Sequence, residues 1–146
     1  MASEVLVTKI VHFDAAHFLY NSKWTREENI AKFHKCSKFK PDGSEEPHGH
    51  TYTVEVSVGG YVDEDTGFVI DFKELKKIIE EKIMEQLDHR LINNIPYFND
   101  KLATAENIVQ FIWQQLQLEI NTPGRRLWKI KLYETPDSYV EYDGML

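Results

Sequence analysis

The amino-acid sequence predicts an α+β fold, in which an antiparallel sheet carries two helices packed on one face. Segments with alternating apolar and polar residues stand near both ends of the chain, and two segments with helical spacing lie between them. No repeat, low-complexity tract or Pro/Gly-rich linker interrupts the 146 residues, which is a usual length for one domain. We therefore expect residues 1–146 to form a single domain.

The expected strands follow from alternation with a period of two residues. Residues 4–17 are rich in β-branched residues, and most of their large apolar side chains share one parity. Residues 51–58 give the clearest pattern, because Tyr52 and three valines alternate with polar residues until Gly59-Gly60. Further strands are expected at 68–70, 127–133 and 139–142.

Two helices are expected between these strands. Asp71 is suited to cap the first helix, and Glu74 stands three residues later, as in a capping box. The second helix begins near Thr104 and carries Glu106 in its first turn, where a negative charge is favourable. It ends at the Asn-Thr-Pro-Gly turn of residues 121–124.

The composition excludes several classes of protein. A formal net charge of −7 argues against a general nucleic-acid binder, whose affinity depends on neutralising phosphates. No apolar run approaches the roughly 20 residues that cross a bilayer, and the N-terminus lacks the layout of a secretory signal. Cys36 is the only cysteine, so no intrachain disulfide can form, as is typical of a reducing compartment. We expect a cytoplasmic protein with no nucleic-acid or membrane partner.

Three of the six histidines are candidate metal ligands. His48 and His50 open the clearest strand, and residues two apart on a strand project to the same side. His17 ends the first strand on the parity of Phe13. Three imidazoles from two strand ends can form the base of a catalytic zinc site with an open fourth position. The alternative is that these histidines only form hydrogen bonds.

Three further features are candidates for acid–base chemistry or binding. Asp88 precedes His89 after the first helix, where a carboxylate can raise the basicity of an imidazole or where the pair is only a solvated helix end. Cys36 lies in segment 18–47, which has weak periodicity and is interpreted as a long, functional loop. Nearby basic residues lower a thiol's pKa, although a lone cysteine is also a common inert apolar residue. Glu134 ends the last long strand, either as an exposed residue or as an acceptor of paired N–H donors from a planar heterocycle.

Taken in order, these segments resemble the 6-pyruvoyltetrahydropterin synthase / 6-carboxytetrahydropterin synthase family. The matching stretches span nearly the whole chain: Phe13-Asp14-Ala15-Ala16-His17, Cys36, His48-Gly49-His50-Thr51-Tyr52, the run 65–72, Leu87-Asp88-His89, Thr104-Ala105-Glu106-Asn107 and Glu134-Thr135. The short loops and the Thr51-Tyr52 pair look more like the microbial, queuosine-type branch of the family than the animal branch.

The resemblance implies a tunnelling fold, in which the sheets of several subunits join into a barrel, typically in a homohexamer with active sites at subunit interfaces. It implies Zn2+ as the cofactor, and Glu134 as the residue that anchors the guanidine-like edge of a pterin. The implied site residues are the zinc ligands His17, His48 and His50, the proton-transfer residues Cys36, Asp88 and His89, and the substrate-binding residues Glu134, Thr104 and Glu106.

The implied substrate is a small molecule, 7,8-dihydroneopterin triphosphate. In the main interpretation the protein is a zinc-dependent lyase, a 6-carboxy-5,6,7,8-tetrahydropterin synthase that releases acetaldehyde and triphosphate in queuosine biosynthesis. The alternatives are a 6-pyruvoyltetrahydropterin synthase, a folate-type lyase that leaves a hydroxymethyl pterin, and a non-catalytic pterin- or metal-binding module.

The spacing of the candidate cysteine departs from the family pattern. Family cysteines lie a few residues before the His-Gly-His element, whereas eleven residues separate Cys36 from His48 here. An extra turn at 40–44 would restore the geometry by looping out of the way. Alternatively, Glu45 or Glu46 takes the position of the base. We expect Cys36 to be the base.

Overall fold

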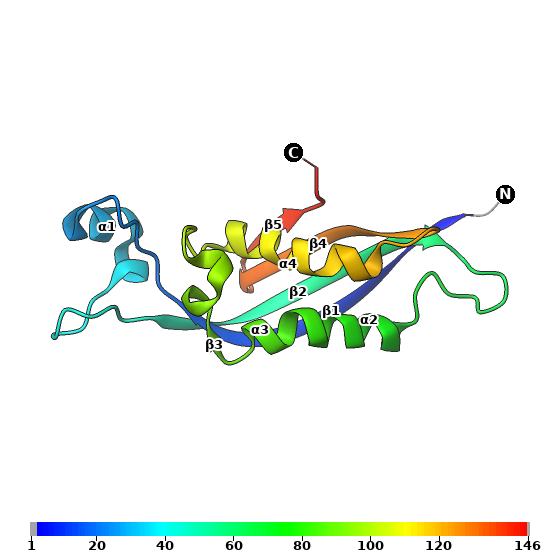
Figure 1. The fold of residues 1–146 in the computed structure, drawn as a ribbon, viewed down its shortest axis with the longest axis horizontal. Coiled ribbons are helices and arrows are strands. Elements are labelled where there is room, and N and C mark those ends of the chain that lie inside the picture. Colours follow the sequence, from blue (N-terminus) through cyan, green and yellow to red (C-terminus); the bar gives the residue numbers. More distant parts are fainter. Residues whose placement is uncertain (1–2, 146) are drawn as a thin grey trace.

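A five-stranded sheet is the base of the fold (Figure 1), and the computed structural model describes residues 3–145. The strand order is β3-β1-β2-β4-β5, with bounds β1 Glu4–His17, β2 His48–Tyr61, β3 Arg90–Leu91, β4 Arg125–Thr135 and β5 Ser138–Tyr142. β1 pairs antiparallel with β2 along its whole length, and β2 with β4 and β4 with β5 are also antiparallel. The expected antiparallel sheet is therefore confirmed. β3 is an addition that pairs parallel with β1, and two residues are too few to show a period in the sequence.

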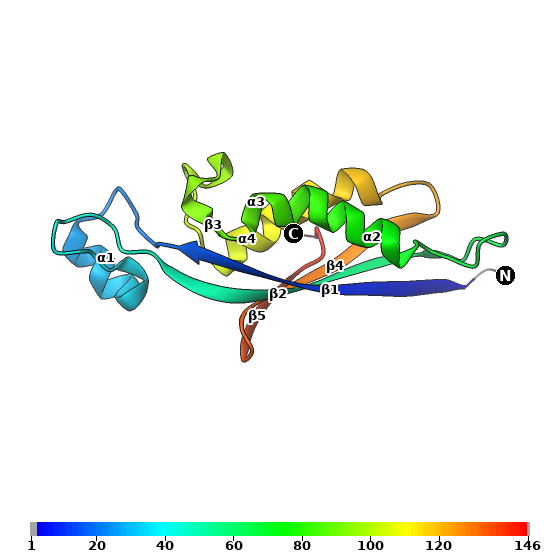
Figure 2. The ribbon, with the colours of Figure 1, turned by 90° about the horizontal axis from the view of Figure 1, so that it is seen from below.

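The helices cover one face of this sheet, as Figure 2 shows, which confirms the expected layer arrangement. They are α2 Phe72–Ile79, the π-helical segment Glu80–Met84, α3 Glu85–Leu87 and α4 Ala105–Ile120. Asp71 and Thr104 are their N-caps, since their side chains accept backbone N–H groups of the first turns. Glu74 does not complete a capping box, because its carboxylate pairs with Arg125 at 3.3 Å. None of the helices within residues 3–145 has the length and apolarity to cross a membrane.

The core lies between the sheet and these helices. Its strand members share one face of the sheet, and its helix members form apolar stripes: Phe13, Tyr52, Val54, Val56, Val58, Ile130 and Leu132, with Leu75, Ile79, Ile83, Leu87, Ile108, Ile112 and Leu116. Burying one such large side chain contributes about 1.5–3 kcal/mol, so this packing holds β1 and β2 in register. The end of β1 and the start of β2 continue this alternation, so side chains there that share the parity of Phe13 and Tyr52 also project to the helical side of the sheet.

The strand expected at 68–70 is wrong. Residues 62–71 form a turn, in which the Asp63 carboxylate accepts the N–H groups of Asp65 and Thr66. The Asp63 N–H donates to the Phe68 carbonyl at 2.9 Å, which closes the turn before a strand can form. Of the apolar run, Ile70 is buried in the core, Val69 packs against it and Phe68 is exposed.

Segment 18–47 is not only a loop, because it contains α1 (Arg26–Phe33) and a 3-10 helix (His34–Ser37) at the far end of the sheet (Figure 1). A capping box joins Thr25 and Glu28 at the start of α1. Asn29 is fully buried in it, and its amide bonds Asn21 and Thr25. This helix is held by buried polar contacts rather than by an apolar stripe, so hydrophobic periodicity did not indicate it.

Candidate active site

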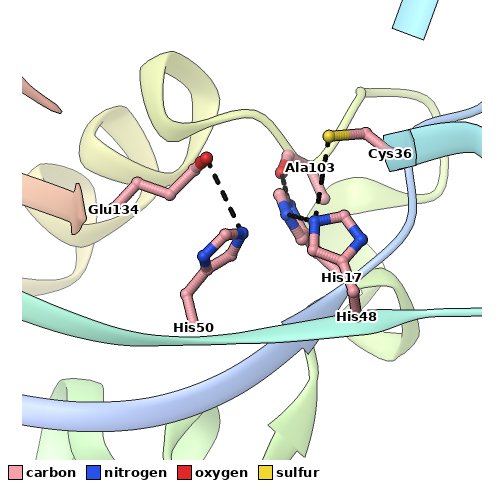
Figure 3. A network of polar contacts seen from close by, with 6 residues as sticks. All are labelled: His17, Cys36, His48, His50, Ala103 and Glu134. Carbon is pink, nitrogen blue, oxygen red and sulfur yellow. Dashed lines mark hydrogen bonds and ion pairs between the residues drawn. The ribbon is translucent and has the colours of Figure 1, made fainter. Parts of the chain in front are cut away.

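Three histidines converge on the helical side of the sheet, at the end of β1 and the start of β2 (Figure 3). The strand register places His17 opposite His48 and Ala15 opposite His50. His17 Nε2 lies 3.0 Å from His48 Nε2, and each of the three rings offers a nitrogen within 4.8 Å of the others. The expectation that these side chains project together is met by the geometry.

The tautomer of His17 is fixed by its surroundings. Its ring is buried, with 1% of the residue exposed, and its Nδ1–H donates to the Ala103 carbonyl at 2.8 Å. Nε2 of His17 therefore carries the lone pair and faces the other two rings. Ala103 immediately precedes the N-cap of α4, so the start of this helix orients one of the candidate ligands.

The donor set fits a metal ion. Two nitrogens that each lie about 2.0–2.1 Å from a tetrahedral zinc ion are about 3.3 Å apart, close to the His17–His48 separation. His50 Nε2 is buried and has no hydrogen-bond partner within residues 3–145, although the Glu134 carboxylate lies 3.7 Å away. Buried polar atoms normally have a partner, so a buried imidazole nitrogen that no protein group pairs with is suited to bind a metal ion. Zinc, with its preference for imidazole and its tetrahedral geometry, suits this set.

Burial also keeps these imidazoles in the neutral form that binds metals. Desolvation is the main cause that lowers the pKa of His17, and the same cause, followed by the charge of neighbouring His17, lowers the pKa of His48. Both rings are thus unprotonated at neutral pH and at somewhat lower pH. Protons therefore compete weakly with a cation for these nitrogens.

We expect the metal-free protein to lose stability as the pH falls below about 6.5, the ordinary pKa of a histidine. The unfolded chain takes up protons at that pH while the folded chain resists them, so the unfolded state holds more protons and gains relative to the native state. The effect is absent at higher pH, where both states are neutral, and is complete below the lowered folded pKa. Unfolding midpoints measured with a chelator between about pH 8 and pH 5 check this.

A matched pair of variants tests whether the buried histidines cause this loss of stability at low pH. His48→Gln should make the pH profile shallower, because an amide does not titrate and His17 then supplies the remaining slope. His12→Gln should leave it steep, because His12 is exposed on the other face of the sheet, where it bonds Thr53. A wild-type profile that stays flat down to about pH 5 would contradict the prediction.

Cys36 lies beside the histidines in spite of its distance in sequence. Its Sγ is 3.8 Å from His48 Nε2, at the end of the 3-10 helix. The intervening residues form a closed turn, in which Lys40 N–H donates to Ser44 O and Glu46 N–H to Lys38 O. This turn loops out and returns the chain to His48, as the sequence analysis required. Glu45 and Glu46 lie in the stem of the turn, where Glu46 pairs with Lys38 at 3.3 Å.

The electrostatic surroundings of Cys36 differ from the expectation. Burial first, and the charge of Glu134 second, raise the pKa of the thiol. The basic residues of the segment do not reverse this effect. The expected lowering of the pKa by neighbouring cations is therefore wrong for the protein without a metal ion, and the thiol is protonated at neutral pH.

Glu134 and Tyr52 complete this cluster. Glu134 is the penultimate residue of β4, and its charge acts on His17, His48, Cys36 and Tyr52. Tyr52 lies two residues beyond His50 on the same face of β2, and burial raises its pKa. The sequence analysis counted Tyr52 only as a strand residue. The alternation that places His48 and His50 on one face of β2 also places Tyr52 there, and this pattern could have identified Tyr52 from the sequence.

Asp88 and His89 form a second cluster, separate from the three histidines. Their side chains lie 3.0 Å apart, which adjacent residues achieve here because His89 adopts a left-handed backbone conformation with φ 59°. The Asp14 N–H donates to Asp88 Oδ1, and the His89 N–H donates to the Asp14 carbonyl. The dyad is therefore fixed to the edge of β1, and 77% of the His89 side chain is exposed.

The remaining predicted site residues lie at the start of α4. Thr104 is the N-cap, with its hydroxyl accepting the Asn107 N–H, and it is partly buried. Glu106 is exposed in the first turn. Thr104 follows Ala103, the residue that orients His17, so the start of α4 borders the histidine cluster.

Comparison with known proteins decides the family. A family model described as 6-pyruvoyl tetrahydropterin synthase matches residues 6–145. The chain belongs to this family. Curated family members from Pongo abelii and Homo sapiens, each called 6-pyruvoyl tetrahydrobiopterin synthase, are 42% and 41% identical over 139 residues, which cover 94% of this chain and 90% of each relative. The structure of Caenorhabditis elegans 6-pyruvoyl tetrahydropterin synthase superposes with a TM-score of 0.86 at 29% identity, covering 99% of this chain and 98% of that one.

These family members bear on the branch that the sequence suggested. The animal relatives carry the name of the pyruvoyl enzyme rather than that of the microbial, queuosine-type branch. They support the 6-pyruvoyltetrahydropterin synthase alternative better than the main interpretation. The tunnelling fold is confirmed at the level of the single chain by the C. elegans structure.

Proposed function

We propose that this protein is a zinc-dependent 6-pyruvoyltetrahydropterin synthase, which converts 7,8-dihydroneopterin triphosphate to 6-pyruvoyltetrahydropterin and triphosphate. The observation that carries the proposal is the convergence of His17, His48 and His50 with Cys36 beside them and Glu134 opposite. The names of the animal relatives support the pyruvoyl product over the carboxy product.

The three imidazoles would hold the zinc ion, with His17 oriented by Ala103. When bound, the ion supplies positive charge that favours the ionised forms of the substrate's side-chain hydroxyls and of the nearby thiol. Cys36 is the residue placed to accept a proton from the substrate side chain, because its sulfur lies beside the cluster, 3.8 Å from His48 Nε2.

Glu134 is suited to hold the pterin ring. Its carboxylate stands opposite His50, 3.7 Å away, and a carboxylate accepts two parallel N–H donors from a guanidine-like edge. Holding the ring at Glu134 directs the ring's side chain towards the histidines and Cys36. Thr104 and Glu106, at the start of α4, are the further substrate-binding residues of this proposal.

The second proton-transfer group is proposed to come from a neighbouring subunit. Asp88 and His89 lie beside the edge of the sheet, directly before β3, which pairs only with Ala15 and Ala16 of β1. The rest of the β1 edge offers unpaired backbone groups to another strand. Joining of sheets into a barrel, as in a hexamer, would bring the dyad of one chain towards the Cys36 of another, and His89 would then deliver a proton to the opposite face of the substrate.

The products test the function. The purified zinc-loaded protein should convert 7,8-dihydroneopterin triphosphate to 6-pyruvoyltetrahydropterin and triphosphate, as measured by mass spectrometry under anaerobic conditions. Formation of 6-carboxytetrahydropterin with acetaldehyde would assign the protein to the carboxy branch instead. A hydroxymethyl pterin would indicate folate-type cleavage, and no reaction at all would overturn the enzymatic proposal.

A further inference from the structure

A shallow hollow lies between α1 and the 3-10 helix that carries Cys36. Its volume is about 450 Å³, and four of the residues that line it bear basic side chains: Arg26, His34, Lys35 and Lys38. All four residues are exposed, so their polar ends can meet a ligand that arrives from solvent. A hollow with this lining is suited to an anion.

The charge of the surrounding segment is opposite to that of the whole chain. Residues 21–40 carry six lysines and arginines against two glutamates, whereas the formal net charge of the chain is −7. A cluster of positive charge on an acidic protein attracts anions to one place, while the rest of the surface repels them. The hollow therefore suits a small ligand of high negative charge.

Arg26 is held in position at the hollow. Its guanidinium group lies over the ring of Phe39, 4.1 Å from the ring centroid, and donates to the Gly43 carbonyl at 3.2 Å. A guanidinium carries five N–H donors in one plane, so this contact leaves donors that can pair with two oxygens of a phosphate group. Gly43 belongs to the 40–44 turn, which thus helps to hold a side chain of the hollow.

The hollow adjoins the proposed base. Lys35 and Ser37 line it, and each is the chain neighbour of Cys36, whose sulfur lies 3.8 Å from His48 Nε2. Consecutive Cα atoms are about 3.8 Å apart, so the hollow begins within one residue of the group proposed to act on the substrate's side chain. The triphosphate is carried at the end of that three-carbon side chain. A substrate whose side chain lies at Cys36 therefore brings its phosphates to the basic residues on either side of Cys36.

We propose that the hollow is a polyphosphate-binding site, in which Arg26, Lys35 and Lys38 bind the triphosphate group of the substrate. The inference rests on the proposed function, because this triphosphate is the leaving group of the same reaction. Lys38 pairs with Glu46 at 3.3 Å in the free protein, and exchanging this exposed pair for a phosphate costs little, since exposed ion pairs are weak.

The test replaces single charges with methionine, which keeps a long unbranched side chain. Inorganic tripolyphosphate is titrated into the zinc-loaded protein, and its Kd is measured by calorimetry for the wild type, Lys35→Met and Arg26→Met. We expect Kd to rise about 3- to 10-fold in each variant, as for the loss of one charge-assisted contact at an exposed site. KM for 7,8-dihydroneopterin triphosphate should rise by a similar factor, whereas Kd for 7,8-dihydroneopterin, which has no phosphate, should stay constant.

Lys32→Met is the matched control. Lys32 is an exposed lysine of α1 outside the lining of the hollow, so its loss changes the net charge equally and should raise Kd by less than about twofold. An equal rise in Lys32→Met and Lys35→Met would show only diffuse attraction and overturn the site. An unchanged Kd in Lys35→Met also overturns it, because tripolyphosphate then binds elsewhere, for example at the zinc ion. Lys35→Met decides if Arg26→Met loses stability, since Arg26 also contacts Phe39 and Gly43.

The two proposals fail in different ways. If the wild type converts the triphosphate substrate but does not bind tripolyphosphate, or binds it no better than Lys35→Met does, the inference fails and the proposed function stands. If tripolyphosphate binds the wild type more tightly than Lys35→Met and no pterin is converted, the enzymatic function fails and the polyphosphate site stands. A wild type that neither binds tripolyphosphate nor converts the substrate overturns both.

Discussion

Replacing His50 with alanine is expected to abolish stoichiometric zinc binding and to lower kcat by about a thousandfold or more. His50 supplies one of three converging nitrogens, and two imidazoles form a much weaker site than three. A catalytic metal ion contributes several kcal/mol to the stabilisation of a transition state, and about 4 kcal/mol corresponds to a thousandfold in rate. Zinc content by elemental mass spectrometry and product formation by chromatography measure the two effects on one sample.

His12→Ala is the matched control for that variant. His12 also lies on a long strand, β1, but it is exposed and bonds Thr53 on the opposite face of the sheet. It should retain both zinc and activity. Full zinc occupancy in His50→Ala would exclude His50 as a ligand. Loss of zinc with normal activity would instead exclude the metal from the reaction.

Replacing Cys36 with alanine is expected to lower kcat by about 10²- to 10⁴-fold, the usual contribution of a positioned acid–base group. Zinc content and KM should change little, because the sulfur lies 3.8 Å from His48 and is not one of the three converging donors. Steady-state kinetics together with zinc analysis separate this loss from the loss of a ligand. Cys36→Ala therefore differs from His50→Ala in keeping its metal.

Glu45→Gln and Glu46→Gln test the alternative base. The eleven residues between Cys36 and His48 leave open that one of these glutamates, rather than Cys36, accepts the proton. Both residues lie in the stem of the 40–44 turn, and Glu46 already pairs with Lys38. Each variant should keep kcat within about threefold of the wild type, as expected for residues outside the reaction. If Cys36→Ala is active and one glutamine variant is not, the base is that glutamate, and the expected reaction outcome changes with it.

Much of the fold could be predicted because its long strands have a strict period. Tyr52 and the valines after it mark one face of β2, and the stripe from Leu75 to Leu87 marks a helix. The failures have local causes. Buried Asn29 holds α1 by polar contacts that leave no apolar stripe, and Asp63 folds 68–70 into a turn. The two-residue β3 has no period to detect.

The candidate site was predictable where it depends on strand parity. His48 and His50 are two apart on one strand, and His17 joins them through the register of β1 with β2. The position of Cys36 depends on the closure of the 40–44 turn, which only the structure reveals. The orientation of His17 by Ala103 was also not predictable, because these residues are 86 positions apart. The proposed branch rests on the names of the animal relatives, since these features are compatible with more than one product.

The π-helical segment Glu80–Met84 has a consequence for the chain's tolerance of length changes. Such a widened turn accommodates one residue more than a regular α-helix, and it often occurs near functional sites. Deleting a single residue there would restore ordinary i-to-i−4 bonding and leave Leu87 and the dyad after it close to their present places, because the widened turn absorbs that residue. A regular α-helix with the same number of residues would instead rotate the residues after the segment by about 100° around the axis, so that Leu87 would leave the core and the turn carrying Asp88 and His89 would miss the edge of β1. The irregular turn thus keeps the apolar stripe before it in phase with the dyad after it.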